Sequence, residues 1–343
     1  MNRKRFLSLL SQLGSLAFLP AAARAAGKGR LPGPAAALIP PYLQPGDTIA
    51  LTSPGGYITL PELQPAIQVL QSWGYVVKIG ATIGRRDFNF GGTDEERAAD
   101  FQQLLDDPSV QAILCARGGY GCIRIVDRLN WTKFRQQPKW VIGFSDVSVL
   151  HQHIHRHCGI ATLHSKMCNS FPADWSQAEP IQVQTIASIH EALAGKPMAY
   201  TAEPHPQNRP GTAEGVLVGG NLKIFETLSG TASDIPTAGK ILFVEDTHEY
   251  LYSIDRMFWN LQRTGKLKGL KGLIVGGFNV KPDDEGEEFG RSLQEIVLDK
   301  VKKYDYPVCF NFPVGHQRAN FALKCGLRHR LSVNENVTLT EIV

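Results

Sequence analysis

The sequence predicts an α/β fold, because short apolar strands alternate with helical segments and glycine-rich turns follow several of the strands. In the first half of the 343-residue chain, the segments expected as strands are 47–52, 75–79, 110–115 and 140–144. The segments between them show apolar residues at helical spacing, which favours parallel strands. We therefore expect an N-terminal, Rossmann-like parallel-sheet domain over residues 45–171.

The helices of this half begin with recognisable signals. Residues 60–73 carry apolar residues near helical spacing. Thr93 can cap the next helix, and Glu96 stands three residues later, as a capping box requires. A further helix is expected at 123–129, directly after the glycine turn 117–121.

The second half differs in character. A helix at 181–193 is followed by a proline-rich stretch, so we expect residues 172–212 to form a linker. Beyond it, the sequence predicts a smaller, mixed α/β C-terminal domain over residues 213–343. Its expected strands are 215–218, 241–244, 272–275 and 337–339, and its expected helices are about 221–229, 253–264 and 290–304.

The first 26 residues resemble an export signal. Basic residues at 3–5 precede a mostly apolar stretch, and Ala23-Arg24-Ala25 is a small-x-small cleavage site. The basic cluster is similar to a twin-arginine signal with lysine in place of the second arginine, so both export routes stay open. We expect an exported, periplasmic protein. The alternative is a basic tail on a cytoplasmic enzyme.

Charge and composition argue against several classes of protein. Four of the 36 basic residues lie in the expected signal, so the rest of the chain has 32 basic and 32 acidic residues and a net charge of zero. Such a chain does not favour nucleic-acid partners, and no apolar stretch is long enough for a stable membrane span. The six cysteines include no C-x-x-C pair, so we expect no metal site and no cofactor.

Cys122 follows the turn Arg117-Gly118-Gly119-Tyr120-Gly121, whose spacing differs from that of nucleotide-binding loops. A strand, a glycine turn, one reactive side chain and a helix are the layout of a nucleophile elbow. The helix N-terminus would lower the pKa of the thiol, and backbone N–H groups would stabilise an oxyanion. The alternative is a buried structural cysteine beside the glycines.

A nucleophile of this kind needs a base and an acid that orients the base. His316 follows a turn after an apolar segment, and His248 lies in the acidic segment 245–249 after a strand, where α/β proteins display functional groups. Spacing alone leaves the choice between them open. The alternating histidines at 151–157 lack neighbouring carboxylates or cysteines, which favours a partly exposed helix over a metal site.

Several linked motifs occur in order along the chain. They are T-D-E-E-R at 93–97, R-G-G-Y-G at 117–121, G-F-S-D at 143–146, V-G-G-N-L at 218–222, V-E-D at 244–246 with I-D-R-M at 254–257, and G-H at 315–316. Together they resemble the LD-carboxypeptidases (muramoyltetrapeptide carboxypeptidases) and the related microcin C7 self-immunity hydrolases. The resemblance covers about residues 45–343.

The resemblance implies a hydrolase with a serine–histidine–glutamate triad. Cys122 directly follows the R-G-G-Y-G turn, where the resemblance locates the serine, Glu245 begins the acidic pair and His316 follows the late glycine. A homodimer is implied, and so is release of terminal D-alanine from a peptidoglycan tetrapeptide. Backbone N–H groups of Gly119 and Ile123 would hold the oxyanion.

Departures from the family pattern leave alternatives. Cysteine in place of serine means a cysteine hydrolase or an inactive relative, and we favour the enzyme because cysteine is the stronger nucleophile. Where the family tends to have H-G-P, this chain has His164-Ser165-Lys166. Lys166 or Arg117 could therefore bind a substrate carboxylate; otherwise Lys166 is a solvated surface residue and Arg117 braces the turn. An amide or acyl-sulfamate hydrolase and a non-catalytic cell-wall peptide-binding protein are the alternative functions.

Overall fold

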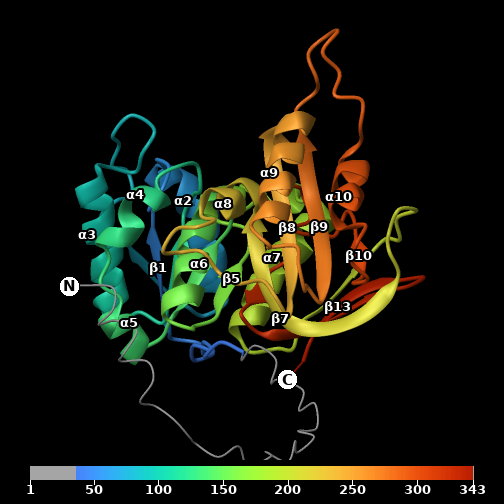
Figure 1. The fold of residues 1–343 in the computed structure, drawn as a ribbon. Helices are drawn as coiled ribbons and strands as arrows, with labels where there is room; N and C mark the ends of the chain where they lie inside the picture. Colours follow the sequence, from blue (N-terminus) through green and yellow to red (C-terminus); the bar gives the residue numbers. More distant parts are fainter. Residues whose placement is uncertain (1–35, 343) are drawn as a thin grey trace, which may run out of the picture. The chain divides into compact units, whose positions relative to one another are not determined.

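The computed structural model describes residues 36–342, and its first sheet is mostly parallel (Figure 1). The strands from β5 to β2 pair in parallel, and β11 runs antiparallel to β5. Because β11 comes from the C-terminal part of the chain, a strand that the sequence did not predict completes this sheet. In spatial order its strands are β11 (Leu323–Cys325), β5 (Thr162–His164), β4 (Trp140–Gly143), β3 (Ala112–Cys115), β1 (Thr48–Thr52) and β2 (Val76–Ile79).

Strands β3 and β4 form the centre of this sheet because they are apolar on both faces. Every residue of the two strands is buried. Parallel sheets carry helices on both faces, so their strands read as continuous apolar runs. The helices of this half are α2 (Leu60–Ser72), α3 (Asp94–Asp106), α4 (Cys122–Ile125), α5 (Thr132–Gln136), α6 (Ser148–His157) and α7 (Pro180–Leu193).

Helix α3 begins as the sequence predicts. The Thr93 hydroxyl accepts the backbone N–H of Glu96, and the Glu96 carboxylate accepts the backbone N–H of Thr93 at 3.0 Å, which confirms the capping box. The helix expected at 123–129 is shorter than predicted, since α4 gives way to the 3₁₀ turn η1 (Val126–Arg128).

The second sheet is mixed, as expected for the C-terminal half. Its strands β10, β9, β8 and β7 are parallel, and β12, β13 and β6 extend the sheet with antiparallel pairings. The two sheets confirm the α/β class. The spatial order is β10 (Val308–Cys309), β9 (Gly272–Val280), β8 (Lys240–Glu249), β7 (Gly211–Asn221), β12 (Arg328–Val333), β13 (Val337–Glu341) and β6 (Ala199–Ala202), with helices α8 (Leu222–Thr227), α9 (Leu251–Arg263) and α10 (Leu293–Val301).

The segment 172–212, expected as a linker, contains α7 and β6. Strand β6 pairs with β13, and the Tyr200 hydroxyl donates to the carbonyl oxygen of Ala322 at 2.6 Å. Helix α6 of the first half packs against β7 and α8 of the second, as Figure 1 shows. Residues 36–342 therefore lie within one compact unit, in which side chains of both sheets can meet.

The export signal predicted for residues 1–26 lies outside the residues that the structure describes. The membrane prediction concerned the whole chain. Within residues 36–342, no helix is both long and apolar enough to cross a bilayer.

Candidate active site

The turn after β4 holds a serine in an uncommon backbone conformation. Ser145 has φ = 61°, in the left-handed region that few non-glycine residues occupy. The 3₁₀ turn η2 (Ser145–Val147) and then α6 follow it. Strain of this kind costs about 1–3 kcal/mol and is concentrated at functional sites. A strand, a sharp turn with a strained serine and a helix form the layout of a nucleophile elbow.

His316 connects the hydroxyl of Ser145 to the carboxylate of Glu245. Its Nδ1 lies 2.5 Å from Glu245 Oε2, and its Nε2 lies 3.1 Å from Ser145 Oγ. A carboxylate only accepts hydrogen bonds, so Nδ1 carries the proton and Nε2 accepts from the serine hydroxyl. The three side chains thus form a hydrogen-bonded series with the polarity of a serine–histidine–acid triad.

Close backbone approach brings His316 to Glu245. Glu245 lies on β8 and is fully buried, and the backbone N–H of His316 also donates to its Oε2 at 3.2 Å. Gly315 has φ = 108°, and a Cβ at this position would lie 2.5 Å from Glu245 Cβ. The turn therefore requires glycine. Asn320 Oδ1 accepts the N–H of Gly315 at 2.8 Å and fixes the turn.

The glycine turn 117–121 borders the Ser145 hydroxyl. A Cβ on Gly118 would lie 3.2 Å from Ser145 Cβ and 3.4 Å from its Oγ, so this turn packs directly on the serine. Among the residues described, the backbone N–H groups of Gly119 and Asp146 have no hydrogen-bond acceptor. Unpaired N–H groups beside a nucleophile are suited to holding an oxyanion.

A buried arginine and a buried aspartate hold this turn in place. Arg97 of α3 is fully buried, pairs with Asp94, and donates to the carbonyl oxygens of Pro54, Gly92 and Gly121. Asp146 Oδ2 accepts the backbone N–H of Cys122 at 2.8 Å. Burial raises the pKa of the Asp146 carboxyl. The residue after Ser145 is thereby tied to the glycine turn.

Cys122 lies in the core rather than in a cleft. Its side chain is fully buried in the apolar cluster that also holds Cys115 and Val126. Burial, with a smaller effect of the nearby Asp146 carboxylate, raises the pKa of the Cys122 thiol well above its usual value. The expected lowering of this pKa is therefore wrong, because desolvation outweighs the dipole of the four-residue helix α4. The side chain in contact with His316 Nε2 is Ser145, not Cys122.

The sequence contains a signal for Ser145. Gly143-Phe144-Ser145 stands between a strand and a helix and matches the first half of the G-x-S-x-G elbow pattern. Gly143 has φ = 157°, and a Cβ there would lie 3.0 Å from both methyl groups of Val147. This single glycine is enough for the sharp turn, so the glycine-richer turn before Cys122 is a misleading guide.

The other predicted site residues lie at different distances from this chemistry. Glu245 and His316 are in contact, and Gly119 belongs to the turn that packs on Ser145. Ile123 packs against the core cluster of Cys122. Of the predicted site residues, only Glu245 and His316 are in direct side-chain contact with each other within the part of the chain that the structure describes.

A cleft of about 720 Å³ opens beside His316 and Phe144. Lys166 lines it, and its Nζ donates to the carbonyl oxygen of Gln317 at 2.6 Å. Burial lowers the pKa of Lys166, which is a cleft residue rather than a solvated surface lysine. His248, the alternative base, also lines the cleft at φ = 59°, where the pairing of β8 with β9 is irregular. The cleft thus offers the ammonium group of Lys166 to an anionic substrate.

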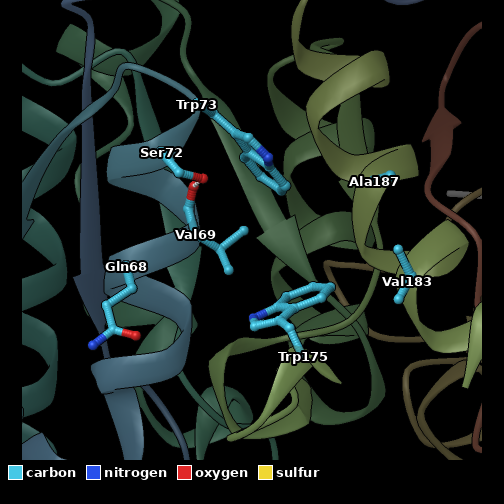
Figure 2. A pocket seen from close by; sticks show the side chains of 7 residues that line it. All are labelled: Gln68, Val69, Ser72, Trp73, Trp175, Val183 and Ala187. Carbon is cyan, nitrogen blue, oxygen red and sulfur yellow. Dashed lines mark hydrogen bonds between the residues drawn. The ribbon is translucent and has the colours of Figure 1, made fainter. Parts of the chain in front are cut away.

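A separate pocket of about 360 Å³ lies between α2 and α7 (Figure 2). Trp73 and Trp175 face it from two sides, and Val69 and Val183 complete most of its apolar lining. None of its lining residues is shared with the cleft beside His316. Its lining also has no titratable side chain, so it does not suit acyl transfer.

The histidine run of α6 is more buried than the sequence favours. His151 and His153 are buried, and desolvation lowers the pKa of each to about 4. Within residues 36–342, no group of three or more histidines, cysteines or acidic residues is arranged to hold a metal ion.

Comparison with known proteins identifies the relatives of this chain. Residues 49–165 match the LD-carboxypeptidase N-terminal domain, and residues 214–331 match the LD-carboxypeptidase C-terminal domain. A probable murein peptide carboxypeptidase of Bacillus subtilis is 33% identical over 305 residues, which cover 88% of this chain and 94% of the relative. This chain belongs to the LD-carboxypeptidase family.

Further LD-carboxypeptidase relatives agree in sequence and fold. The murein tetrapeptide carboxypeptidase of Pseudomonas aeruginosa is 29% identical, covering 81% of this chain and 91% of the relative. The crystal structure of muramoyltetrapeptide carboxypeptidase from Oxalobacter formigenes matches with a TM-score of 0.76 and 30% identity, over 86% and 98% of the two chains. MccF with bound glutamyl sulfamoyl guanosine shares the fold, with a TM-score of 0.76 and 23% identity over 90% and 99%. As a member of this carboxypeptidase family, the chain is a hydrolase.

Proposed function

We propose that this chain releases the terminal D-alanine from a peptidoglycan tetrapeptide, with Ser145 as nucleophile, His316 as base and Glu245 as the acid that orients it. The observation that carries the proposal is the 3.1 Å contact between Ser145 Oγ and His316 Nε2, continued by the 2.5 Å contact to Glu245. The substrate class follows from the relatives of B. subtilis and P. aeruginosa, which are named as murein peptide carboxypeptidases.

The reaction begins when His316 takes the hydroxyl proton of Ser145 as the serine oxygen attacks the carbonyl carbon before D-alanine. Glu245 keeps the proton on Nδ1 and stabilises the positive charge of the imidazolium. The C–N bond then breaks, His316 gives its proton to the departing amine, and an ester remains on Ser145. A water molecule deprotonated by His316 attacks the ester, which frees the tripeptide and restores the hydroxyl.

Backbone N–H groups supply the stabilisation of the oxyanion. With Ser145 as nucleophile, the unpaired N–H groups of Gly119 and Asp146 are the proposed donors, so Asp146 takes the role expected for Ile123. Removing one such donor from an acyl-transfer enzyme typically costs about 10²- to 10³-fold in kcat. The hydrogen bond from the backbone N–H of Cys122 to the Asp146 carboxylate stabilises the loop that presents the backbone N–H of Asp146.

Lys166 is the proposed ligand for the carboxylate of D-alanine. His316 protonates the leaving amine, so D-alanine must occupy the cleft on the His316 side. Lys166 Nζ lies in that cleft, bonded to the carbonyl oxygen of Gln317, the residue after His316. One carbon separates the amine of D-alanine from its carboxylate, which brings the negative charge near the ammonium group.

The decisive experiment incubates the purified protein with a muropeptide tetrapeptide and measures free D-alanine. An aminoacyl-sulfamoyl nucleoside is assayed in parallel, because the fold shared with MccF makes such hydrolysis the second candidate. Release of D-alanine by the wild type, and none by Ser145→Ala, supports the proposal. Tight binding of the tetrapeptide without any release would instead mean a non-catalytic cell-wall peptide-binding protein.

Export to the periplasm, as a homodimer, completes the proposal. The basic residues at 3–5, the apolar stretch that follows them and the small-x-small site at 23–25 support export. Fractionation of cells that express the full chain tests the location, and replacement of Arg3 by lysine, which keeps the positive charge, tests the twin-arginine route. Light scattering on the purified protein tests the dimer, and a mass near 37.7 kDa would contradict it.

A further inference from the structure

The turn that follows β1 lies against the glycine turn that follows β3. The two strands pair in parallel with Thr52 opposite Cys115, so both end at the same edge of the first sheet. The backbone N–H of Ala116 donates to the carbonyl oxygen of Thr52 at 2.8 Å, which continues the pairing beyond the end of β3. The four residues after β1, Ser53-Pro54-Gly55-Gly56, therefore run beside the turn 117–121, and we call them the β1 turn.

Two arginines hold these turns together. Buried Arg97 donates from a single nitrogen, Nη1, to the carbonyl oxygens of Pro54 and Gly121, one from each turn. Arg117 Nη1 donates to the carbonyl oxygen of Tyr57, the residue after the β1 turn, at 3.0 Å. Arg117 therefore braces the two turns, and the position of one turn depends on that of the other.

Main chain meets main chain where the two turns touch. The N–H of Gly56 donates to the carbonyl oxygen of Gly118 at 2.7 Å. A Cβ on Gly55 would lie 2.6 Å from that same oxygen, and a Cβ on Gly119 would lie 3.3 Å from Cα of Gly56. Side chains at these positions would push the turns apart, so the glycines are what allows the hydrogen bond to form.

The hydrogen bond from Gly56 fixes the direction of a proposed oxyanion donor. The carbonyl group of Gly118 and the N–H of Gly119 belong to one trans peptide group, which is planar, so the two point in opposite directions. Holding the carbonyl oxygen therefore also directs the N–H, which has no acceptor among the described residues. Because Gly118 packs on Ser145, this peptide group lies next to the proposed nucleophile.

A buried hydroxyl holds Gly56 in place. Ser53 is fully buried, and its Oγ donates to the carbonyl oxygen of Gly56. The backbone N–H of Ser53 donates to the hydroxyl oxygen of Thr82 at 2.9 Å, and Thr82 donates in turn to the buried carboxylate of Asp100 at 2.6 Å. Ser53 is thus anchored from below, and its side chain closes the β1 turn over Gly56.

We propose that Ser53 is a positioning residue for the oxyanion donor, acting through Gly56 and Gly118 on the N–H of Gly119. Its side chain has no exposed surface, so it does not touch the substrate. The inference rests on the proposed function, because it assumes acyl transfer at Ser145. Without the hydroxyl, the peptide group before Gly119 is less well directed. Stabilisation of the developing oxyanion is then lost, whereas binding of the intact peptide is kept.

The experiment measures kcat and KM for D-alanine release in two variants that reach the same peptide group by different routes. Ser53→Ala removes only the hydroxyl. Gly56→Ala leaves Ser53 intact and places a Cβ 3.0 Å from the carbonyl oxygen of Gly118, so it decides the matter even where Ser53→Ala is not recovered folded. In each variant kcat should fall by about 10- to 100-fold with KM unchanged, which is less than the roughly 10²- to 10³-fold loss when a donor is removed outright.

Thr237→Val is the matched control for loss of a buried hydroxyl. Thr237 is buried before the start of β8, and its hydroxyl donates to the carbonyl oxygen of Lys266 at 2.6 Å. This variant should keep the kcat and KM of the wild type, and urea unfolding compares its stability with that of Ser53→Ala. A similar fall of kcat in Thr237→Val would mean a general effect of lost stability. Unchanged kcat in Ser53→Ala, or a rise of KM alone, would also overturn the inference.

A fluorophosphonate probe separates failure of the inference from failure of the proposed function. The probe forms a bond from its phosphorus to an activated serine oxygen with loss of fluoride, and its phosphoryl oxygen occupies the oxyanion site without any peptide. If the wild type releases no D-alanine, the proposed function fails, and the rate of labelling at Ser145, located by mass spectrometry, still tests Ser53. Slower labelling in Ser53→Ala and Gly56→Ala than in the wild type and Thr237→Val supports the inference. Equal rates, or no labelling of the wild type, contradict it.

Discussion

The turns after β3 and β4 look similar in sequence and differ in chemistry. The first places Cys122 after a glycine-rich run, and the second places Ser145 two residues after a single glycine. Cys122 is fully buried, whereas the hydroxyl of Ser145 contacts His316 and its backbone is held at φ = 61°. In this fold, two separate turns meet the two requirements of a nucleophile elbow. The glycine turn provides space and free N–H groups, and the strained turn carries Ser145, the proposed nucleophile.

The environments of the two side chains explain this division. A thiol becomes reactive when its pKa falls, but desolvation raises the pKa of Cys122. A serine hydroxyl needs no lowered pKa when a base accepts its proton directly, as His316 can. The same fold therefore buries the side chain of one candidate and places that of the other beside a base.

Among the substitutions at these two turns, Ser145→Ala should change activity most. Ser145→Ala removes the attacking oxygen, so kcat for D-alanine release should fall by about 10⁴-fold or more. Cys122→Ala is the matched control and should retain kcat within a few-fold. Steady-state assays of both variants, with circular dichroism to verify folding, provide the measurement. The reverse pattern would make the thiol the nucleophile.

Glu245→Gln is expected to have the next largest effect. Glutamine can hold the ring of His316 but cannot stabilise the imidazolium as a carboxylate does, so kcat should fall by about 10³- to 10⁴-fold. Glu249→Gln is the control, since Glu249 lies on the same strand and bonds to Ser253 instead. Similar losses in the two variants would show a general effect on β8 rather than a role for Glu245.

Alkylation tests how accessible the thiol of Cys122 is in the folded protein. Iodoacetamide should leave Cys122 of the native protein unmodified, because its side chain is buried and its thiol pKa is raised. Cys158 is the one partly exposed cysteine within residues 36–342 and should react first. Mass spectrometry of tryptic peptides, with a urea-unfolded sample as reference, gives the order. Preferential labelling of Cys122 would contradict the burial of its side chain.

Acid should destabilise the helix that follows Ser145. The pKa of buried His151 is lowered to about 4 in the folded chain, against about 6.5 when unfolded. The unfolded state thus binds more protons between these values, so this stability is present above pH 6.5 and is lost as pH falls toward 4. The loss between pH 7 and 5 is about 2 kcal/mol for His151. Urea unfolding at pH 7 and pH 5 measures this loss of stability. If the free energy of unfolding of His151→Gln fell between the two pH values as much as that of the wild type, His151 would not be the cause.

The smallest effect concerns the stability contributed by Cys122. Cys122→Ala removes one buried sulfur atom and should lower the free energy of unfolding by about 1 kcal/mol. Urea unfolding at neutral pH measures it, and Cys158→Ala serves as a control at a partly exposed position. A loss several times larger would mean that Cys122 supports the glycine turn and the loop of Asp146 more strongly than its volume suggests.

Periodicity, capping residues and ordered motifs are local signals, so the sequence predicts the α/β class and the cap of α3, and it points to Glu245 and His316 as site residues. It did not distinguish Cys122 from Ser145, since both follow glycine turns between a strand and a helix. The contact between Ser145 and His316, which lie 171 positions apart along the chain, is visible only in the folded molecule. The two sheets pack within one unit, and this packing brings Ser145 and His316 into contact. The Cys122 side chain is buried in the core, so its thiol is expected to be unreactive. The contact and the burial both depend on how elements far apart in the sequence pack together. The local spacing of residues along the chain carries no information about that packing.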